Sequence, residues 1–260
     1  MNATVEQAAR VASLAGKIVL VTGATSTFGI GRVSALAMAM AGAYVYVTGR
    51  KSDSGAETVA EIEAAGGKAS FLKLDVTVES DWIEAMAAVR EQSGRLDILV
   101  NNAGNAFYVP IEEMPLESVW YLAHLNIEGA FLGHTYAWPL MKDPGAVVVD
   151  INSVAGQRGS VGGTSYRSSK GGLLGLSRAA AIDGRRQGIR VVSVHPGGTW
   201  TPGMERVRGR EAYEQGVRNT PLGRGAESAD IAAAVVYLAS DAAQHVNGIE
   251  YNIDGGESAR

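Results

Sequence analysis

A tyrosine and a lysine four positions apart are the residues of this chain whose types and spacing suggest acid–base chemistry. Tyr166 and Lys170 end the stretch SVAGQRGSVGGTSYRSSK. On a helix, this spacing places the phenol and the ammonium on one face. A free phenol has a pKa of about 10, and a neighbouring ammonium lowers that pKa by favouring the phenolate. Such a pair exchanges protons with a substrate oxygen, but an unrelated Tyr and Lys on a surface helix give the same pattern.

A glycine-rich turn is the second chemical feature. An apolar run at residues 18–21 predicts a strand buried on both faces, and Gly23, Gly29 and Gly31 interrupt the segment that follows it. An Ala/Leu/Met-rich segment then predicts a helix to Ala41. Strand, glycine-rich turn and helix N-terminus form a cradle for a diphosphate. With 33 glycines in the chain, a turn without a ligand remains the alternative, and the spacing departs from Gly-x-Gly-x-x-Gly.

The end of the second predicted strand indicates which dinucleotide is bound. Residues 44–48 are apolar or β-branched, and Gly49, Arg50 and Lys51 follow them. In a dinucleotide fold, a carboxylate here binds the ribose 2′-hydroxyl, whereas an arginine accommodates a 2′-phosphate. The cations favour NADP(H). NAD(H) remains possible, because cations in surface turns are commonly just solvated.

The elements that must position these residues alternate between strand and helix. We predict an α/β fold in which a seven-stranded parallel sheet, flanked by helices, forms one doubly wound Rossmann-type domain. Such sheets bind ligands at the carboxyl ends of their strands. Asn126 falls inside a predicted helix, where Asn is costly unless it is exposed or bound to a specific group. Further strands are expected at residues 69–74, 96–100, 146–151, 189–194 and 248–253. Further helices are expected at residues 55–65, 117–141 and 230–239; another begins after Thr77, and the helix of Tyr166 and Lys170 runs to about residue 183.

Composition narrows the class of protein. The 260 residues are 46% hydrophobic, which is enough for the core of a single domain over residues 1–260. Within it we expect an N-terminal arm at residues 1–15 and a substrate lid at about residues 200–224. A net charge of −4 argues against nucleic acid as a partner. Cysteine is absent and the four histidines lack metal-ligand spacing, so no metal is expected. We read no signal peptide and no membrane span, and expect a cytoplasmic protein.

A series of marks runs along the chain: Thr22, Asp75, residues 101–104 (NNAG), Asn126, Ser153, Tyr166, Lys170, residues 196–197 (PG) and Thr201. Taken in order, these marks resemble the short-chain dehydrogenase/reductase (SDR) family over residues 14–256. The C-terminal residues 221–224 and 254–256 are similar to the branch with 3-oxoacyl-carrier-protein reductases and many sugar, steroid and polyol dehydrogenases. One departure is that the turn between Gly23 and Gly29 carries two extra residues, so that Thr25, Ser26 and Thr27 offer hydroxyls to a phosphate.

The resemblance implies a mechanism and a cofactor site. Tyr166 is then the general acid in reduction and the base in oxidation, while Lys170 lowers its pKa and holds the nicotinamide ribose. Ser153 hydrogen-bonds the substrate oxygen, and Asn126 completes a water-linked proton relay to Lys170. The expected cofactor contacts are Gly23, Thr25, Ser26, Phe28, Gly29, Ile30, Arg50, Asp75, Val76, Asn102, Ala103, Gly104, Tyr166, Lys170, Pro196, Gly197, Thr199 and Thr201.

The expected function is an NADP(H)-preferring oxidoreductase that interconverts a small-molecule ketone and a secondary alcohol. The alternatives are a 3-oxoacyl thioester reductase and a non-catalytic, nucleotide-sensing protein of the same fold. The resemblance also suggests a homotetramer or homodimer formed through the helices of Asn126 and Tyr166.

Two groups of side chains are candidates for substrate contacts. Aromatic and apolar residues that follow strand ends suit a pocket wall, although core packing explains them almost as well. Arginines in the lid either hold an anionic substrate or are simply solvated. The first group is Phe107, Tyr108, Trp200 and Met204, and the second is Arg206, Arg208, Arg210 and Arg218.

Overall fold

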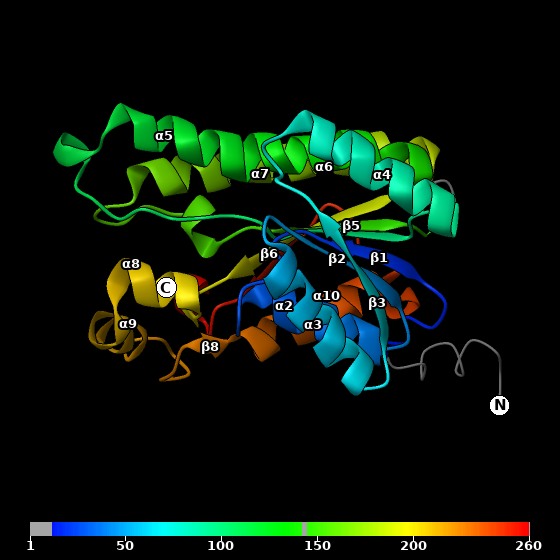
Figure 1. Cartoon of the computed structure of the whole chain (residues 1–260). Helices are drawn as coiled ribbons and strands as arrows, with labels where there is room; N and C mark the ends of the chain where they lie inside the picture. The colour runs from blue at the N-terminus through cyan, green and yellow to red at the C-terminus, as the bar shows by residue number, and fades with distance from the viewer. Residues whose placement is uncertain (1–11, 142–144, 260) are drawn as a thin grey trace.

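The computed structural model describes residues 12–141 and 145–259, and a seven-stranded sheet runs through its centre (Figure 1). All neighbouring strands of this sheet are parallel, in the order β3-β2-β1-β4-β5-β6-β9. The predicted α/β class and seven-stranded parallel sheet are therefore confirmed. The strands are β1 (Ile18–Val21), β2 (Tyr44–Gly49), β3 (Lys68–Lys73), β4 (Ile98–Asn101), β5 (Val147–Ile151), β6 (Arg190–Pro196) and β9 (Glu250–Ile253).

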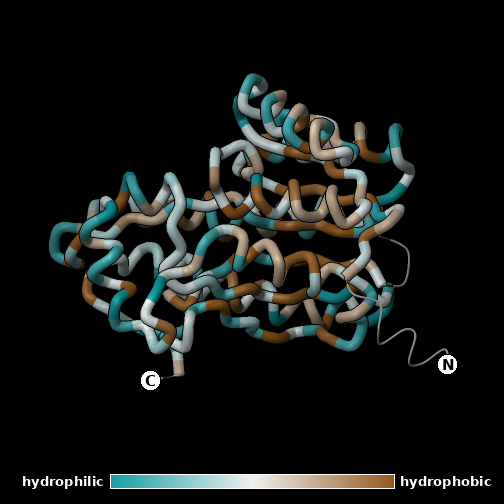
Figure 2. The backbone as a smooth tube through the Cα atoms, turned by 90° about the horizontal axis from the view of Figure 1, so that it is seen from below, coloured by the Kyte–Doolittle hydropathy of each residue, from teal (hydrophilic) through white to brown (hydrophobic). Residues whose placement is uncertain are grey.

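Helices cover both faces of the sheet (Figure 1). One face carries α2 (Ile30–Met40), α3 (Ser52–Ala64) and α10 (Ser228–Ala239). The other carries α4 (Glu79–Ser93), α5 (Leu116–Ala123), α6 (Gly129–Ala137) and α7 (Thr164–Asp183). Hydrophobic residues are concentrated in these central layers (Figure 2). Short 3₁₀ turns occupy Ile111–Glu113, Trp138–Leu140, Val154–Gly156, Gly184–Arg186, Asp241–Ala243 and Glu257–Ala259.

The strand sequences explain the two-sided core. On β1, Val19 and Val21 belong to the hydrophobic cluster on one face of the sheet, whereas Leu20 belongs to the cluster on the other face. Successive strand residues point to opposite faces, so a continuous apolar run fills both. Every residue of β5 is likewise buried. These rigid strands deliver the polar residues that follow them to one edge of the sheet.

The segment around Asn126 differs from the prediction. Residues 116–140 are helical without a break, which confirms the predicted helix, but it is not uniformly α: a π-helical turn, His124–Glu128, lies between α5 and α6. Asn126 lies in this turn, and its side chain is 2% exposed. Single π turns inside helices are frequent at functional sites.

Short elements lie beyond the carboxyl ends of the strands, in and next to the segment expected to form the lid. They are β7 (Thr199–Trp200), α8 (Pro202–Arg208), α9 (Arg210–Val217) and β8 (Ala226–Glu227). The Thr201 hydroxyl caps α8 by accepting a hydrogen bond from the Met204 amide at 3.1 Å. Tyr213 anchors α9 as its only buried residue. The expected lid is thus largely helical.

The predicted N-terminal arm is only partly described. Residues 1–11 lie outside the described residues, but Leu14 is fully buried and its amide donates a 2.9 Å hydrogen bond to the Ala41 carbonyl. The prediction that the arm extends to residue 15 outside the core was therefore wrong at Leu14. Among the described helices, none is both long and apolar enough to cross a bilayer.

Candidate active site

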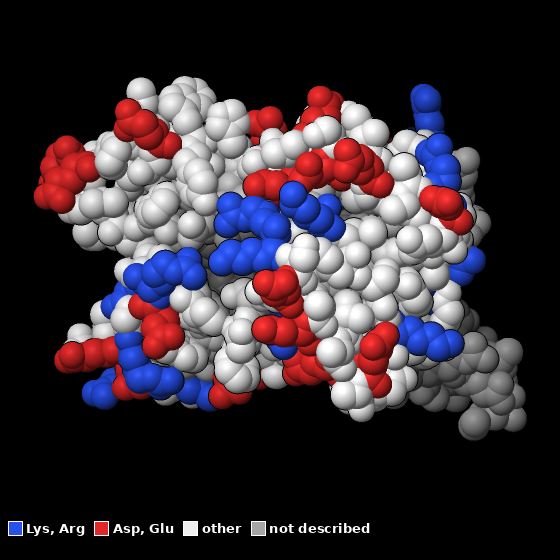
Figure 3. Space-filling model, viewed as in Figure 1, with Lys and Arg blue, Asp and Glu red and all other residues white. Residues whose placement is uncertain are grey.

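A cavity of about 580 Å³ opens at the carboxyl edge of the sheet. Figure 3 shows this face hollowed, with Lys and Arg side chains gathered on both sides of the hollow, over the ends of β2 and β3 and over α8. The cavity brings together residues that lie far apart in the sequence. Of the expected catalytic and cofactor residues, it is lined by Gly23, Thr25, Ser26, Gly29, Ile30, Arg50, Asp75, Val76, Asn102, Ala103, Gly104, Ser153, Tyr166, Lys170, Pro196, Gly197, Thr199 and Thr201.

Two glycines keep the floor of this cavity open. Gly23 has φ +64°, and a Cβ there would lie 3.0 Å from the Cα atom of Ala103. A Cβ on Gly31 would lie 2.3 Å from Nδ2 of Asn102. Side chains at both positions are therefore excluded, and backbone is exposed next to the start of α2 at Ile30. The cradle suits the diphosphate of a dinucleotide.

The two extra residues of the glycine-rich turn form an outward bend. The Gly29 amide donates to the Ser26 carbonyl at 2.8 Å, and the Phe28 carbonyl accepts from the Ser228 hydroxyl at 2.7 Å. Phe28 has φ +54° and is 75% exposed. It does not line the cavity, so its expected cofactor contact is not supported. The extra length bends outward at Phe28, while Thr25 and Ser26 remain on the cavity wall.

Arg50 and Asp75 lie together at the end of the cavity next to β2 and β3. Their nearest charged atoms, Nη1 and Oδ2, are 3.9 Å apart. The other oxygen of Asp75 accepts hydrogen bonds from the Thr77 amide at 3.1 Å and the Thr77 hydroxyl at 2.8 Å. Asp75 is therefore fixed, whereas the Arg50 side chain is 73% exposed. Arg50 is thus able to reach an anion at the cavity mouth.

The expected catalytic residues Tyr166, Lys170 and Ser153 meet at the other end. Tyr166 and Lys170 lie one turn apart on α7. Lys170 Nζ donates to the Ile151 carbonyl at 2.8 Å. Burial lowers the pKa of Lys170 from 10.5 to about 8, and the nearby Asp150 charge acts against this shift. The Ser153 hydroxyl oxygen accepts a hydrogen bond from the Ala155 amide at 3.1 Å.

The electrostatics of Tyr166 differ from the expectation. Burial raises the pKa of its phenol well above 10, and Tyr108 raises it further. A hydrogen bond with Ser153 and the Arg167 charge lower it, but by less. The expectation that Lys170 lowers the Tyr166 pKa is therefore not met in this structure, where its ammonium is bound to a backbone carbonyl. Tyr166 is a neutral phenol at neutral pH, the form that donates a proton to a carbonyl oxygen.

Asn126 lies behind the cavity wall rather than on it. Its Oδ1 accepts from the Asn105 amide at 3.0 Å, and its Nδ2 donates to the Asn105 carbonyl at 3.0 Å and the Ser169 hydroxyl at 2.9 Å. A Cβ on Gly104 would lie 3.0 Å from Asn126 Oδ1 and 3.7 Å from Lys170 Nζ. Asn126 therefore holds the loop after β4 next to Lys170.

The four expected pocket residues divide into two pairs. Tyr108 and Met204 line the cavity. Phe107 and Trp200 do not: their rings pack against Tyr121 and Tyr213, at centroid distances of 5.8 Å and 5.0 Å. Tyr121 and Tyr213, which sequence reasoning missed, are the rings that reach the wall. Phe107 and Trp200 support it from behind.

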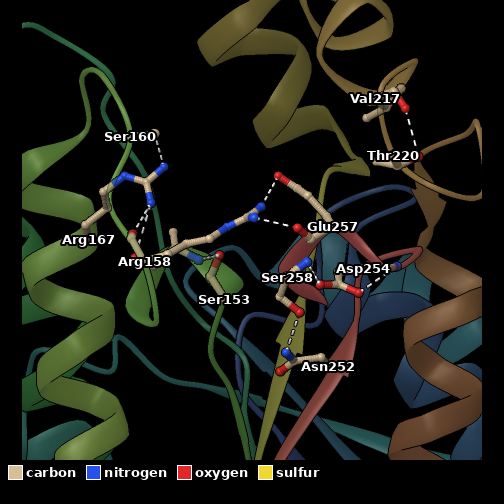
Figure 4. Close-up of polar contacts among 12 residues, drawn as sticks. Ser153, Arg158, Ser160, Arg167, Val217, Thr220, Asn252, Asp254, Glu257 and Ser258 are labelled. Carbon is tan, nitrogen blue, oxygen red and sulfur yellow. Dashed lines mark hydrogen bonds and ion pairs between the residues drawn. The ribbon is translucent and has the colours of Figure 1, made fainter. Parts of the chain in front are cut away.

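Two arginines that the sequence analysis passed over shape the substrate end (Figure 4). Arg167 donates to the carbonyl of Arg158 and to the Ser160 hydroxyl. Arg158 in turn donates to the Glu257 carbonyl at 2.6 Å and pairs with its carboxylate. These contacts tie the loop after Ser153 both to α7 and to the C-terminal segment. Both arginines lie inside the stretch that suggested catalysis, but no local pattern identifies a partner 99 residues away.

A buried polar network beneath Lys170 was also missed. The carboxylate of Asp150, on β5, is fully buried and accepts hydrogen bonds from Asn101 Nδ2 at 2.9 Å and the Ser177 hydroxyl at 2.6 Å. His134 Nε2 lies 3.1 Å from the same carboxylate. Burial favours the protonated acid, but attraction to His134 and these hydrogen bonds outweigh it and lower the pKa of Asp150. The network joins β4, β5, α6 and α7.

Comparison with known proteins agrees with this geometry. A family model described as enoyl-(acyl carrier protein) reductase matches residues 23–258. The chain is 36% identical to a cyclopentanol dehydrogenase of Comamonas sp. over 245 residues, 94% of this chain and 97% of that protein. It is also 36% identical to a trans-4-hydroxycyclohexanecarboxylate dehydrogenase of Sinomonas cyclohexanicum over 252 residues, 95% of this chain and 94% of that protein.

A solved structure supports the same assignment. A 7α-hydroxysteroid dehydrogenase in complex with NADH and 7-oxo glycochenodeoxycholic acid superimposes with a TM-score of 0.89. The two chains are 34% identical, and the match covers 94% of this chain and 95% of that one. This sequence identity over nearly the whole of both chains indicates common ancestry in addition to a shared fold. By its sequence, its sheet and its relatives, this chain belongs to the short-chain dehydrogenase/reductase family.

Proposed function

We propose that this chain is an NAD(P)(H)-dependent oxidoreductase, with NADP(H) preferred, that interconverts a ketone and a secondary alcohol. The observation that carries the proposal is one cavity lined both by a glycine cradle and by Ser153, Tyr166 and Lys170. Relatives named for cyclopentanol and for trans-4-hydroxycyclohexanecarboxylate support a ring alcohol as substrate. The tyrosines and apolar side chains of the cavity wall suit such a ring.

The nicotinamide cofactor, when bound, accepts or donates the hydride at the carbinol carbon. The protein's part is to orient the substrate and to move one proton. In reduction, the neutral Tyr166 phenol donates its proton to the carbonyl oxygen, and in oxidation its phenolate takes the hydroxyl proton. Ser153 hydrogen-bonds the same substrate oxygen. Lys170 lies one helical turn away, with its ammonium held on the Ile151 carbonyl, and would hold the nicotinamide ribose.

The cofactor preference rests on Arg50 and Lys51 at the end of β2. Arg50→Ala should weaken NADPH binding by about 10- to 100-fold, the range expected for a lost hydrogen bond to a charged group. NADH affinity should stay within about twofold, because NADH lacks the 2′-phosphate. Fluorescence titrations with both cofactors measure this, with Lys68→Ala, an exposed lysine at the start of β3, as the control. Equal losses for both cofactors would contradict the 2′-phosphate assignment.

Steady-state turnover tests the activity itself. The panel is cyclopentanol, trans-4-hydroxycyclohexanecarboxylate, a hydroxysteroid and a 3-oxoacyl thioester, each with NADP(H) and with NAD(H), and products are identified by mass spectrometry. We expect ketone formation from at least one ring alcohol. Preference for the thioester would favour the carrier-protein alternative. Cofactor binding without any product would instead favour a nucleotide-sensing role.

A further inference from the structure

Arg208, on α8, lines the substrate end of the cavity, and its guanidinium has no hydrogen-bond partner among the described residues. Its Cζ atom lies 4.4 Å from the centre of the Tyr108 ring, so that the guanidinium is stacked on an aromatic face. Within the described residues it has no ion pair and no hydrogen bond, although a guanidinium carries five N–H donors in a rigid fork. Stacking leaves the edge of that fork free for a planar anion.

Tyr108 contacts both Arg208 and Tyr166, and so links the guanidinium to the reacting centre. Tyr108 stacks on Arg208 on one side, and its ring centre lies 5.9 Å from that of Tyr166. One aromatic ring therefore separates the guanidinium from the phenol that holds the proton. A substrate whose oxygen lies at Tyr166 thus reaches Arg208 with a group about one carbon ring away. Both residues line the same cavity.

The side chains around Arg208 also carry an excess of positive charge. Arg158, Arg167 and Arg206 also line the cavity, and among the described residues only Arg158 of the three pairs with an acid, Glu257. Arg167 donates to neutral oxygens, and Arg206 has no ion pair within the described chain. Burial lowers the pKa of Arg167; Tyr108 opposes this shift, and the charges of Arg158 and Arg208 add to it. The guanidiniums therefore repel one another, and an anion between them relieves this repulsion.

The other arginines of the same segment differ. Arg210 pairs with Glu214 at 3.2 Å, and Arg224 pairs with Asp230 at 2.9 Å. Arg218 is exposed and does not line the cavity. Of the two alternatives left open for these arginines, solvation fits Arg210 and Arg218, whereas Arg206 and Arg208 line the cavity. Arg206 and Arg208 are exposed as well, and Arg210 also stacks on a ring, that of Trp200, so what distinguishes Arg206 and Arg208 is that they line the cavity.

We propose that the substrate carries a carboxylate about one ring distant from its reacting alcohol or ketone carbon, and that Arg208 binds this carboxylate. The inference rests on the proposed function for the reacting end, and it adds the substrate class. The carboxylate takes no part in the redox step: hydride and proton leave or join the carbinol group, and the carboxylate is unchanged. Arg206 and Arg167 add favourable charge, and Arg208 supplies the paired hydrogen bonds.

Binding of unreactive probes tests this inference without turnover. The probes are cyclohexanecarboxylate and its neutral match, cyclohexanecarboxamide, titrated calorimetrically into the full chain with NADPH present. The carboxylate should bind about 10- to 100-fold more tightly than the amide, as expected for hydrogen bonds to a charged group. Arg208→Gln should abolish this preference, and Arg208→Lys should restore part of it. Arg218→Gln, the same change outside the cavity, should leave it intact.

Three results would overturn the inference. The first is that the wild type binds both probes with equal affinity. The second is that Arg208→Gln and Arg218→Gln lose the preference for the carboxylate probe to the same extent. The third is that Arg208→Gln loses about tenfold in NADPH affinity while its preference for the carboxylate probe is unchanged. The last would assign the guanidinium to a cofactor phosphate. Melting temperatures of all variants show whether each is folded. Cyclopentanol turnover tests the proposed oxidoreductase separately, because this alcohol has no carboxylate.

Discussion

At the residue scale, the buried ammonium of Lys170 lowers the free energy of unfolding. Its side chain is 5% exposed, and burial lowers its pKa to about 8 from 10.5. Below pH 8 both the folded and the unfolded chain hold the proton, so the full burial cost opposes folding. As pH rises from 8 towards 10.5 the folded chain releases the proton first, and the free energy of unfolding rises.

Lys170→Met should therefore be more stable than the wild type at pH 7, and the difference should shrink as pH rises. One unit of pKa shift corresponds to about 1.4 kcal/mol, so the gap should close by on the order of 2 kcal/mol between pH 7 and pH 10. Urea unfolding at both pH values measures it. Lys68→Met, at an exposed lysine, should not change the pH dependence. A gap that stays constant or widens would contradict the buried-charge account.

Side-chain direction explains which residue predictions failed. The types and spacing of Ser153, Tyr166 and Lys170 identified three lining residues, because strand ends and one helical turn fix their positions. Phe107 and Trp200 were also expected on the wall, but tertiary packing turns each ring against another aromatic ring. No sequence periodicity specifies such a choice in a loop.

At the element scale, the network around Asp150 joins four elements. Its carboxylate is fully buried between β4, α6 and α7, and His134 Nε2 lies 3.1 Å from it. Removing one partner of a buried pair leaves an uncompensated charge, which typically costs about 3–5 kcal/mol. We therefore expect the effects of mutating Asp150 and His134 on the free energy of unfolding to depend on each other.

His134→Leu should lower the free energy of unfolding by about 3 kcal/mol or more. Adding Asp150→Asn should recover part of this loss, because the amide keeps an acceptor for Asn101 while removing the buried charge. Guanidinium unfolding of both single variants and of the double variant gives the coupling. Additive losses would show that Asp150 and His134 do not act as a pair.

Strands and helices could be predicted where the apolar pattern of their own sequence indicates which residues are buried. The runs at β1 and β5 are buried on both faces, so their sequences alone indicate parallel strands. The π turn at His124–Glu128 has no such signal, since it accompanies contacts that Asn126 makes with Asn105 and Ser169. Helices α8 and α9 escaped prediction for a related reason, because only Tyr213 of the two is buried.

At the scale of the whole molecule, one helical layer leaves large apolar side chains exposed. On α5 and α6, Leu116 is 63%, Trp120 59% and Phe131 53% exposed. Apolar side chains gathered on a surface commonly mark an interface. With the family resemblance, they support our proposal of a homotetramer or homodimer formed through the layer of α5, α6 and α7 (Figure 1).

Phe131→Glu should therefore reduce the mass in solution to that of a smaller assembly, because a charge at an apolar interface is desolvated without a partner. Light scattering after size exclusion measures the mass. Ile83→Glu is the matched control, because Ile83 is 52% exposed on α4, outside these helices. A wild-type mass equal to one chain would contradict the proposal, and so would an equal effect of the two variants.

The central claim is that Tyr166 transfers the proton in an NAD(P)(H)-dependent reaction, and Tyr166→Phe tests it most directly. The change removes one hydroxyl and keeps the ring against Tyr108. Turnover of the best alcohol in the panel should fall by about 100- to 10,000-fold, the usual contribution of a positioned acid or base. The dissociation constant of NADPH should stay within about threefold of the wild-type value. Turnover within tenfold of the wild type would contradict the account.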